Sequence, residues 1–389
     1  MRRSLVLILS IVIVALPMAA PAGAVAPVND AFADALALAE PLPALAAATT
    51  TDATTEIGEP VPSCIDNGDF GTSVWYKFTP STDVSAALDT FGSDYDTVVA
   101  LYTGATLNAL TEIACNDEIS FSPATEGRSR VAALLESGTT YHFQVSGFQG
   151  ATGSLELKLV KRRTTPAVIR GDKWFLNAGF DGASEFSFIY GFGNDDPFGG
   201  NFLGLLFGQT GVSTPTVRKG NTWFLNDWFD GTAFVAFPYG RATDLPVAGD
   251  RNGDGSSDIG VVRGNVWHFD TDLDAVADET FAYGLPTDYP VVGDWNGDGT
   301  FTPGVLRGNK WFLNNGTDAN ADVVFSYGSA TDFPVVGDWN GDGIWSAGVV
   351  RGNTWLLNNA TDANADLVFA YGSVTDFPLV GDWDGAVED

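Results

Sequence analysis

The sequence contains few residues of the kinds that catalytic and nucleic-acid-binding sites need. It has two histidines in 389 residues, and it lacks a zinc-binding spacing, a nucleophile elbow and a phosphate-binding glycine loop. Lysine and arginine number 19 against 49 acidic residues, which gives a formal net charge of −30. Nucleic-acid binding needs a basic surface, so this class is excluded. The acidic balance fits cation binding or a solubilising surface.

Cysteines and long apolar runs are also scarce. An exported chain with one pair of cysteines, here Cys64 and Cys115, is predicted to form one disulfide; two buried thiols are the alternative. The apolar run Leu5–Leu16 follows two arginines and is too short to span a membrane. Residues 1–24 are therefore predicted to be a secretory signal peptide. We expect a secreted, extracellular protein without a membrane anchor.

What the chain has in abundance is a block of 44 residues that repeats through its C-terminal half. The Gly-Asp pair recurs at this spacing, beginning at Gly249, Gly293, Gly337 and Gly381. Five segments of the form Phe-x-Tyr-Gly end the repeats: Phe188–Gly191, Phe237–Gly240, Phe281–Gly284, Phe325–Gly328 and Phe369–Gly372. A fixed period of this length indicates a repeat architecture in which each unit buries its faces against its neighbours.

Each repeat is expected to form four short strands, because segments rich in Val, Phe, Trp and Tyr alternate with Gly, Asn and Asp turns. In one copy the strands are predicted at Pro290–Gly293, Thr302–Arg307, Lys310–Asn314 and Val323–Tyr327. This pattern is typical of a β-propeller of about five four-stranded blades over residues 167–389, with a solenoid as the alternative. The first repeat lacks its opening strand and the chain ends with a spare one, so we expect Leu379–Trp383 to pair near Val168–Arg170.

Residues 27–160 lack the repeat and instead show the apolar alternation of a β-sandwich. Strands are predicted at 73–79, 84–91, 97–104, 130–136, 139–148 and 153–160. The Ala-rich stretch Ala31–Ala48 is a possible helix, although Pro41 and Pro43 interrupt it. Residues 161–166 are the predicted linker. The fold class is therefore all-β, a jelly-roll-like sandwich followed by a propeller.

Three loops of the form Asp-x-Asn-x-Asp-Gly repeat in register. Oxygen-bearing side chains at every second residue, followed by Gly, form the first half of a calcium-binding loop, in which the seventh position supplies a backbone carbonyl. The predicted ligands are Asp250, Asn252, Asp254, Ser256 and Asp258; Asp294, Asn296, Asp298 and Thr300; and Asp338, Asn340, Asp342 and Ile344. The first loop is expected to bind most tightly, since its ninth position is Asp258 where the others have Thr302 and Ser346. Ordinary turns are the alternative.

Tryptophans recur in two settings. Those in the third strand of each repeat are expected to be core residues. They are Trp174, Trp223, Trp267, Trp311 and Trp355. Trp295, Trp339 and Trp383 lie between loop ligands and point away from them, so they are candidates for an exposed ligand-binding platform.

The N-terminal part resembles the pre-peptidase C-terminal-like domains of secreted bacterial proteins. The resemblance rests on "NDAFADA" at Asn29, "SVWYKFTP" at 73–80, "DTFGSDYDTVVALYTG" at 89–104 and "GTTYHFQVSGF" at 138–148. It implies a jelly-roll-like sandwich that accompanies an exported protein and has no catalytic role of its own. The segment from 60 to 73, which contains Cys64, departs from the family pattern.

The C-terminal repeats resemble FG-GAP/VCBS-type propellers through their Asp-rich loops. The FG-GAP words themselves are absent, and five blades depart from the seven of the integrin head. The resemblance therefore implies calcium as the bound ion more than it implies a blade count.

The function expected from these features is calcium-stabilised binding or adhesion to an extracellular carbohydrate or cell-surface protein. No catalytic residue is assigned. A secreted polysaccharide-cleaving enzyme is the alternative, because a glycosidase needs only two carboxylates; Asp227 and Asp230, where the second repeat departs from the pattern, are the candidates. An inert matrix component is a further alternative.

Overall fold

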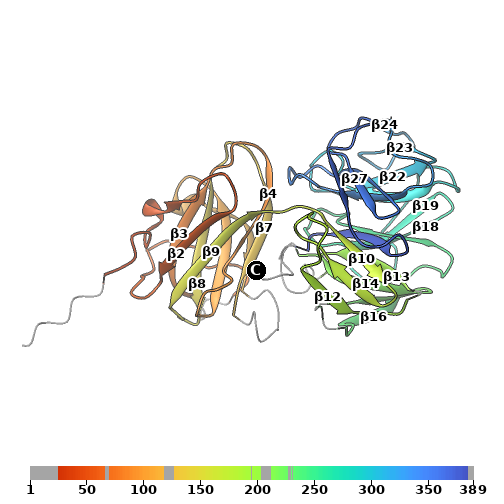
Figure 1. Ribbon diagram of the computed structural model, residues 1–389. Helices are drawn as coiled ribbons and strands as arrows, with labels where there is room; N and C mark the ends of the chain where they lie inside the picture. The colour runs from red at the N-terminus through yellow and green to blue at the C-terminus, as the bar shows by residue number, and fades with distance from the viewer. Residues whose placement is uncertain are drawn as a thin grey trace, which may run out of the picture.

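The computed structural model describes residues 25–65, 70–117, 127–193, 195–202, 212–226, 229 and 231–383. Over these residues the protein is all-β, as predicted, apart from two short 3₁₀ helices, η1 (Phe32–Asp34) and η2 (Leu107–Ala109). The strands form an N-terminal two-sheet region beside a C-terminal five-sheet region (Figure 1). None of the described helices has the length and apolar character needed to cross a membrane.

The two-sheet region contains one sheet of five strands and one of four. The first sheet, in spatial order, is β1 (Leu36–Ala37), β3 (Phe70–Phe78), β8 (Tyr141–Phe148), β5 (Thr97–Thr103) and β6 (Thr111–Asn116). The second is β2 (Ala44–Thr49), β9 (Ser154–Lys161), β4 (Val84–Asp89) and β7 (Arg130–Leu135). Inward-facing side chains of both sheets, among them Tyr76, Leu88, Val145 and Leu157, form one core. This arrangement follows from the period-2 alternation of the sequence.

The Ala-rich stretch does not form the helix considered above. Residues 44–49 are strand β2, which pairs with β9 in the register Ala44↔Leu159 to Thr49↔Ser154. Alanine has high intrinsic helix propensity. Cross-strand partners more than a hundred residues away nevertheless fix the strand, because tertiary context outweighs a local preference.

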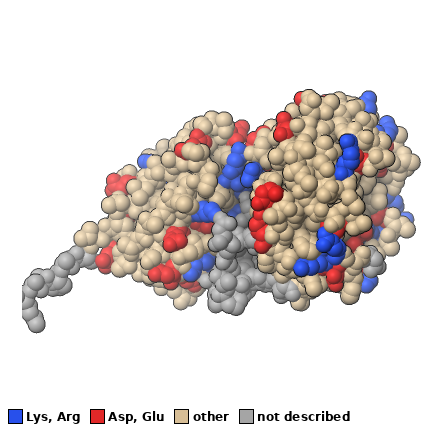
Figure 2. All heavy atoms as spheres, in the orientation of Figure 1, with Lys and Arg blue, Asp and Glu red and all other residues tan. Residues whose placement is uncertain are grey.

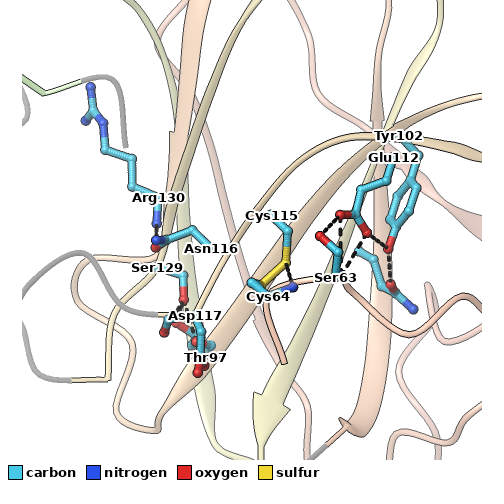
Figure 3. Close-up of a disulfide and its surroundings, with 11 residues drawn as sticks. Ser63, Cys64, Thr97, Tyr102, Glu112, Cys115, Asn116, Asp117, Ser129 and Arg130 are labelled. Atoms are coloured by element: carbon cyan, nitrogen blue, oxygen red, sulfur yellow. Dashed lines mark hydrogen bonds between the residues drawn. A yellow bond between two sulfur atoms is a disulfide. The ribbon is translucent and has the colours of Figure 1, made fainter. Parts of the chain in front are cut away.

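The predicted disulfide between Cys64 and Cys115 is present, and the alternative of two thiols is wrong. It ties the segment before β3 to β6 (Figure 3). Close to it, the Ser63 amide donates to Oε2 of Glu112 (3.1 Å) and the Cys64 amide to Sγ of Cys115 (3.3 Å). The bond spans 51 residues, and in the chain-entropy model it stabilises the fold by about 4 kcal/mol.

The five-sheet region is built from five antiparallel sheets of four strands each. Written from the strand we call inner to the outermost, they are β29 (Phe377–Gly381), β10 (Thr165–Arg170), β11 (Lys173–Leu176) and β12 (Phe186–Ile189); β13 (Asp196–Gly200), β14 (Thr214–Lys219), β15 (Thr222–Leu225) and β16 (Val235–Pro238); β17 (Leu245–Gly249), β18 (Asp258–Arg263), β19 (Val266–Asp270) and β20 (Glu279–Ala282); β21 (Tyr289–Gly293), β22 (Thr302–Arg307), β23 (Lys310–Leu313) and β24 (Val323–Ser326); and β25 (Phe333–Gly337), β26 (Ser346–Arg351), β27 (Thr354–Leu357) and β28 (Leu367–Ala370).

Four of the five sheets share the same aromatic packing, whereas in the second sheet Nε1 of Trp223 is buried without a hydrogen-bond partner. The third-strand tryptophans are all fully buried, as predicted. Trp311 stacks on Phe325 at 6.1 Å and 12°, and its Nε1 donates to the carbonyl oxygen of Tyr327 (3.2 Å). In three other sheets the Trp Nε1 likewise donates to the carbonyl oxygen of the Tyr sixteen residues later. Without this hydrogen bond the buried indole N–H would have no partner. The repeated motif therefore encodes repeated core contacts.

The inner strands contact one another in a cycle, with β29 next to β13, then β17, β21 and β25, which returns to β29. The cycle depends on the last strand, because β29 pairs with β10 in the register Ala167↔Leu379 and Ile169↔Phe377. The expected pairing of the two ends of this region is confirmed. Consequently β10 has no exposed edge.

Removing residues 377–389 should therefore destabilise the five-sheet region. The truncation deletes β29 and the fully buried Trp383, and losing a buried Trp alone costs about 3–5 kcal/mol. Truncation after Trp383 is the matched control, because it leaves β29 intact. Thermal unfolding followed by circular dichroism should give a lower Tm for the longer deletion. Equal melting temperatures would show that closure by β29 contributes nothing.

Candidate metal centre and central cavity

The loop between β17 and β18 folds around the side chain of its first residue. The Asp250 carboxylate accepts hydrogen bonds from the backbone amides of Gly253 (2.8 Å), Asp254 (3.1 Å) and Gly255 (2.7 Å). The two glycines have φ of 75° and 85°, a conformation that glycine adopts without steric penalty. The Asn252 amide donates to Oδ2 of Asp254 (2.9 Å), so these candidate ligands lie side by side.

Asp258 completes this first loop and is its most informative residue. Its side chain is fully buried; Oδ2 accepts the Arg251 amide (2.7 Å), but Oδ1 is buried with no hydrogen-bond partner. Burial raises the pKa of Asp258 to about 8, and the charges of Asp250 and Asp254 act in the same direction. A buried carboxylate oxygen without a partner is costly, and a bound cation would supply one. The carboxylates of Asp250, Asp254 and Asp258 do not, however, all bring a ligand atom within 4.8 Å of one another. A calcium ion in this loop would have to draw them closer together.

The second and third loops repeat this backbone geometry. Asp294 accepts amides from Gly297, Asp298 and Gly299, and Asp338 from Gly341, Asp342 and Gly343. Burial raises the pKa of both first-position carboxyls, that of Asp338 to about 6.

The ninth position separates these loops from the first one. The hydroxyls of Thr302 and Ser346 donate to the carbonyl oxygens of Gly293 (3.4 Å) and Gly337 (3.3 Å). The second and third loops could thus hold a cation with one carboxylate fewer than the first.

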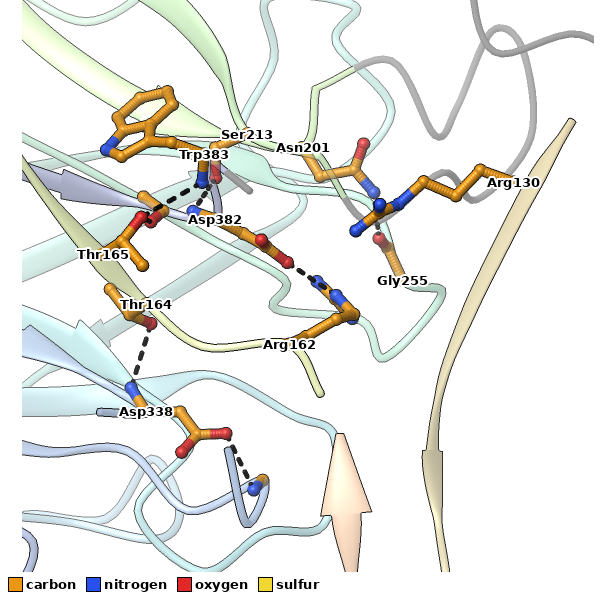
Figure 4. Close-up of polar contacts among 12 residues, drawn as sticks. Arg130, Arg162, Thr164, Thr165, Asn201, Ser213, Gly255, Asp338, Asp382 and Trp383 are labelled. Atoms are coloured by element: carbon orange, nitrogen blue, oxygen red, sulfur yellow. Dashed lines mark hydrogen bonds and ion pairs between the residues drawn. The ribbon is translucent and has the colours of Figure 1, made fainter. Parts of the chain in front are cut away.

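The fourth copy of the motif has a different role. Oδ2 of Asp382 lies 2.6 Å from Nε of Arg162, in the segment that connects the two regions. Figure 4 shows this pair beside Thr164 and Asp338. This copy reads Asp382-Trp-Asp384-Gly, and its shifted glycine predicts poor calcium binding. The contact with arginine supplies a physical reason. Asp384 lies outside the described residues.

Sequence reasoning missed a further acidic loop, between β19 and β20. Asp270, Asp272 and Asp278 form the one group of three acidic, His or Cys side chains in the described chain whose potential ligand atoms all lie within 4.8 Å of one another. Asp270 accepts amides from Asp274 (3.2 Å) and Ala275 (2.9 Å), as Asp250 does in its own loop. The signal was present as Asp at alternate positions, but the loop lacks glycine.

At the positions of those glycines, this loop has two other residues in the left-handed backbone conformation. Leu273 and Ala275 have φ of 59° and 70°. The acidic trio is particular to this repeat, because the equivalent of Asp270 is Asn314 in the next one, and the equivalent of Asp272 is Gly316. The loop could hold a metal ion.

The platform predicted from Trp295, Trp339 and Trp383 is wrong. Their exposed fractions are 7%, 3% and 0%, so none can stack on a ligand. Trp295 folds back over its own sheet, where Nε1 donates to the carbonyl oxygen of Thr302 (3.1 Å), and its ring would lie 2.7 Å from a Cβ on Gly293. These side chains do point away from the loop ligands, but that direction leads into the core. The missing Cβ at glycine provides the space.

A cavity of about 530 Å³ lies among the inner strands. Its wall includes one proline from each inner strand: Pro197, Pro246, Pro290, Pro334 and Pro378. Proline is tolerated there because an inner strand is the edge of its sheet and needs no ladder donor on that side. Residues of the two-sheet region, including Ser85 and Leu134, also line the cavity. The cavity therefore lies between the two regions and along the cycle of inner strands.

The third Asp loop contacts both the two-sheet region and the connecting segment. The Ser85 amide donates to the carbonyl oxygen of Gly341 (3.0 Å), and Thr164 exchanges hydrogen bonds with Asp338 (2.8 and 3.0 Å). A Cβ at Gly343 would clash with the Leu134 side chain, 2.5 Å from its Cδ1, so loop and sheet are closely packed. Figure 2 shows basic side chains along this junction, facing acidic ones on the five-sheet region. The connecting segment is residues 162–164, shorter than the predicted linker.

A scan against protein-family models finds no match, and a search of the curated proteins finds no relative. Residues 1–24 and the enzyme candidates Asp227 and Asp230 lie outside the described residues. The two histidines lie on different regions, His142 on β8 and His268 on β19. The loops and the cavity are therefore the features of the molecule that bear on its function.

Asp258→Thr should reveal whether the first loop binds calcium. It copies the second loop, which has Thr302 at this position, and it removes the unpartnered carboxylate oxygen. We expect a higher Tm without metal, since an unsatisfied buried group costs about 1–3 kcal/mol, but a smaller Tm increase on adding calcium. Differential scanning calorimetry in EDTA and in calcium measures both. An unchanged calcium-dependent increase would contradict metal binding by this residue.

Asp338→Ala should loosen the junction between the two regions. Without its carboxylate, residue 338 no longer holds the amide of Gly341, whose carbonyl accepts the Ser85 amide. Losing one or two hydrogen bonds of about 1 kcal/mol each makes local opening of the junction roughly tenfold more frequent. Limited proteolysis at residues 162–164 should be about tenfold faster. Asp294→Ala is the matched control, because the described part of its loop makes no hydrogen bond to the two-sheet region. Equal cleavage rates in the two variants would exclude a special role for the third loop.

Proposed function

We propose that this chain is a secreted, calcium-stabilised binding protein for an extracellular ligand such as a polysaccharide or a cell-surface component. Its architecture would be a jelly-roll-like sandwich set against one end of a five-bladed β-propeller. The cycle of inner strands and the β10–β29 pairing support the propeller. The single core between two sheets supports the sandwich.

The observation that carries the binding function is the central cavity. A volume of about 530 Å³ falls in the range of small-molecule sites, and its wall combines proline and valine side chains with aromatic rings. Neither His142 nor His268, on β8 and β19, lines the cavity, which favours binding over histidine-based acid–base catalysis there.

Calcium would act as a structural ion in this function. The loops that end the inner strands carry carboxylates whose pKa values are raised by burial. A bound calcium ion would neutralise that charge and stabilise the junction beside the cavity. A ligand that binds only the folded state raises the free energy of unfolding by about 2.7 kcal/mol when its concentration is a hundred times Kd. The ion would thus hold the loops without contacting the ligand.

A glycan array probed in calcium and in EDTA tests this function. We expect binding to a restricted set of glycans or glycoproteins in calcium, and weaker binding in EDTA as the loops lose order. Retention of the bound glycan over hours supports a binding protein. Release of shortened products from the array would instead identify a polysaccharide-cleaving enzyme, and no binding in either buffer would contradict the proposal.

A further inference from the structure

The first residues of the five inner strands lie at the same end of the cycle of inner strands. They are Asp196, Leu245, Tyr289, Phe333 and Phe377, and the three aromatic residues among them line the central cavity. The Asp loops follow the opposite ends of β17, β21 and β25, and the third loop contacts the two-sheet region. The first residues therefore lie at the end of the cavity that faces away from the two-sheet region, and we call them the cavity mouth.

Three aromatic rings line the mouth. Tyr289 and Phe333 meet at 6.3 Å and 70°, and Phe333 and Phe377 at 5.1 Å and 74°. Tyr289 and Phe377 are 44% and 40% exposed although both line the cavity. Clustered exposed aromatics are typical of binding surfaces.

The angles between the rings decide which ligand shape fits. A sugar stacks on one flat ring face, whereas rings at 70° and 74° to one another form walls around an opening. Such walls suit a compact group that inserts between them. Organic cations are attracted to the faces of aromatic rings in this arrangement.

The mouth also carries a carboxylate in place of a fourth ring. Asp196 is 59% exposed and forms an ion pair with Arg218, in which Oδ2 lies 3.6 Å from Nη1, a separation too long for a hydrogen bond. Arg218 instead donates to the carbonyl oxygens of Asp244 (3.0 Å) and Arg241 (2.6 Å). Asp196 therefore keeps oxygens directed to solvent. Burial raises the pKa of Tyr289, and the charge of Asp196 raises it further. The negative charge of Asp196 is therefore close enough to act on Tyr289.

The second repeat departs from the others at this corner. In four repeats an arginine pairs with the Asp just before the inner strand, as Arg307 does with Asp288 at 2.7 Å. The equivalent of Asp288 in the second repeat is Asp195, and no ion pair of Asp195 is found among the described residues. Its Oδ1 is buried without a hydrogen-bond partner. The departure leaves Asp195, next to Asp196 in the chain, without the arginine partner that its equivalents have.

We propose that the cavity mouth binds an organic ammonium group on a short apolar stem, with the cation between the aromatic rings and Asp196. The overall charge of −30 attracts such a ligand to the protein. The proposal rests on the binding function above and names the chemistry of its ligand. An amino sugar and a lysine-like side chain share that chemistry.

The test compares charged and neutral probes of the same shape by saturation-transfer NMR titration. n-Butylammonium should bind about tenfold more tightly than 1-butanol, and glucosamine more tightly than glucose if the source is an amino sugar. Binding of n-butylammonium without glucosamine supports a lysine-like source. Equal binding of butanol and butylammonium would overturn the proposal.

Variants locate the site within the repeats. Asp196→Asn should weaken butylammonium binding about tenfold, and Phe377→Leu, which copies Leu245, several-fold. Leu245→Phe adds a ring and should strengthen binding, a gain that misfolding cannot mimic. Asp172→Asn, an exposed turn residue at the same end, is the control and should change nothing.

The outcome also separates this proposal from the binding function itself. Unchanged affinity in Asp196→Asn and Leu245→Phe overturns the mouth as the ammonium site. Calcium-dependent glycan binding that persists in those variants would then leave the binding function standing with its site elsewhere.

Discussion

The pairing of β29 with β10 is the contact on which the five-sheet region depends. It joins groups 216 residues apart, such as the Thr165 hydroxyl and the Gly381 carbonyl. Every sheet buries its faces against two neighbours, so a missing inner strand in one sheet would leave apolar surface exposed on its neighbours as well. Closure also leaves one edge of every sheet facing the central cavity, where a proline in each inner strand reduces the number of free donors.

At the end of the inner strands next to the two-sheet region, carboxylates order their own loops, and one of these loops also contacts the two-sheet region. Asp250, Asp294 and Asp338 shape their own loops by accepting three backbone amides each. The loop of Asp338 also holds the connecting segment and β4. Burial raises the pKa of Asp258, and the charges of the neighbouring carboxyls add to this effect. A cation would offset that cost where the two regions meet, so local loop order and the contact between regions are coupled.

The regular repeats supply the scaffold, and the irregular repeat supplies chemical variety. Four sheets carry the bidentate arginine–aspartate pair near the mouth, which fixes the turn before the inner strand. The second sheet replaces an aromatic or leucine by Asp196 and redirects Arg218 to main-chain carbonyls. One changed repeat in five is enough to make a symmetric opening chemically asymmetric.

Much of the fold and part of the site could be predicted from the sequence. The alternation of apolar residues and the fixed spacing of 44 residues predicted the exact bounds of β22. They predicted the bounds of the other three strands of that repeat to within two residues. Alternation is informative because successive side chains of a strand point to opposite faces. The disulfide, the third-strand Trp cores and the Asp loops also follow from residue types at set positions.

The tertiary structure alone decided which side chains are reachable. Strand β2, the burial of Trp295, Trp339 and Trp383 and the unpartnered oxygen of Asp258 each depend on residues distant in the chain or on space left by a glycine. The aromatic mouth arises because strands from five repeats begin around one axis. A sequence records which groups recur, whereas only the packing of the sheets determines whether a recurring group meets solvent, an ion or the core.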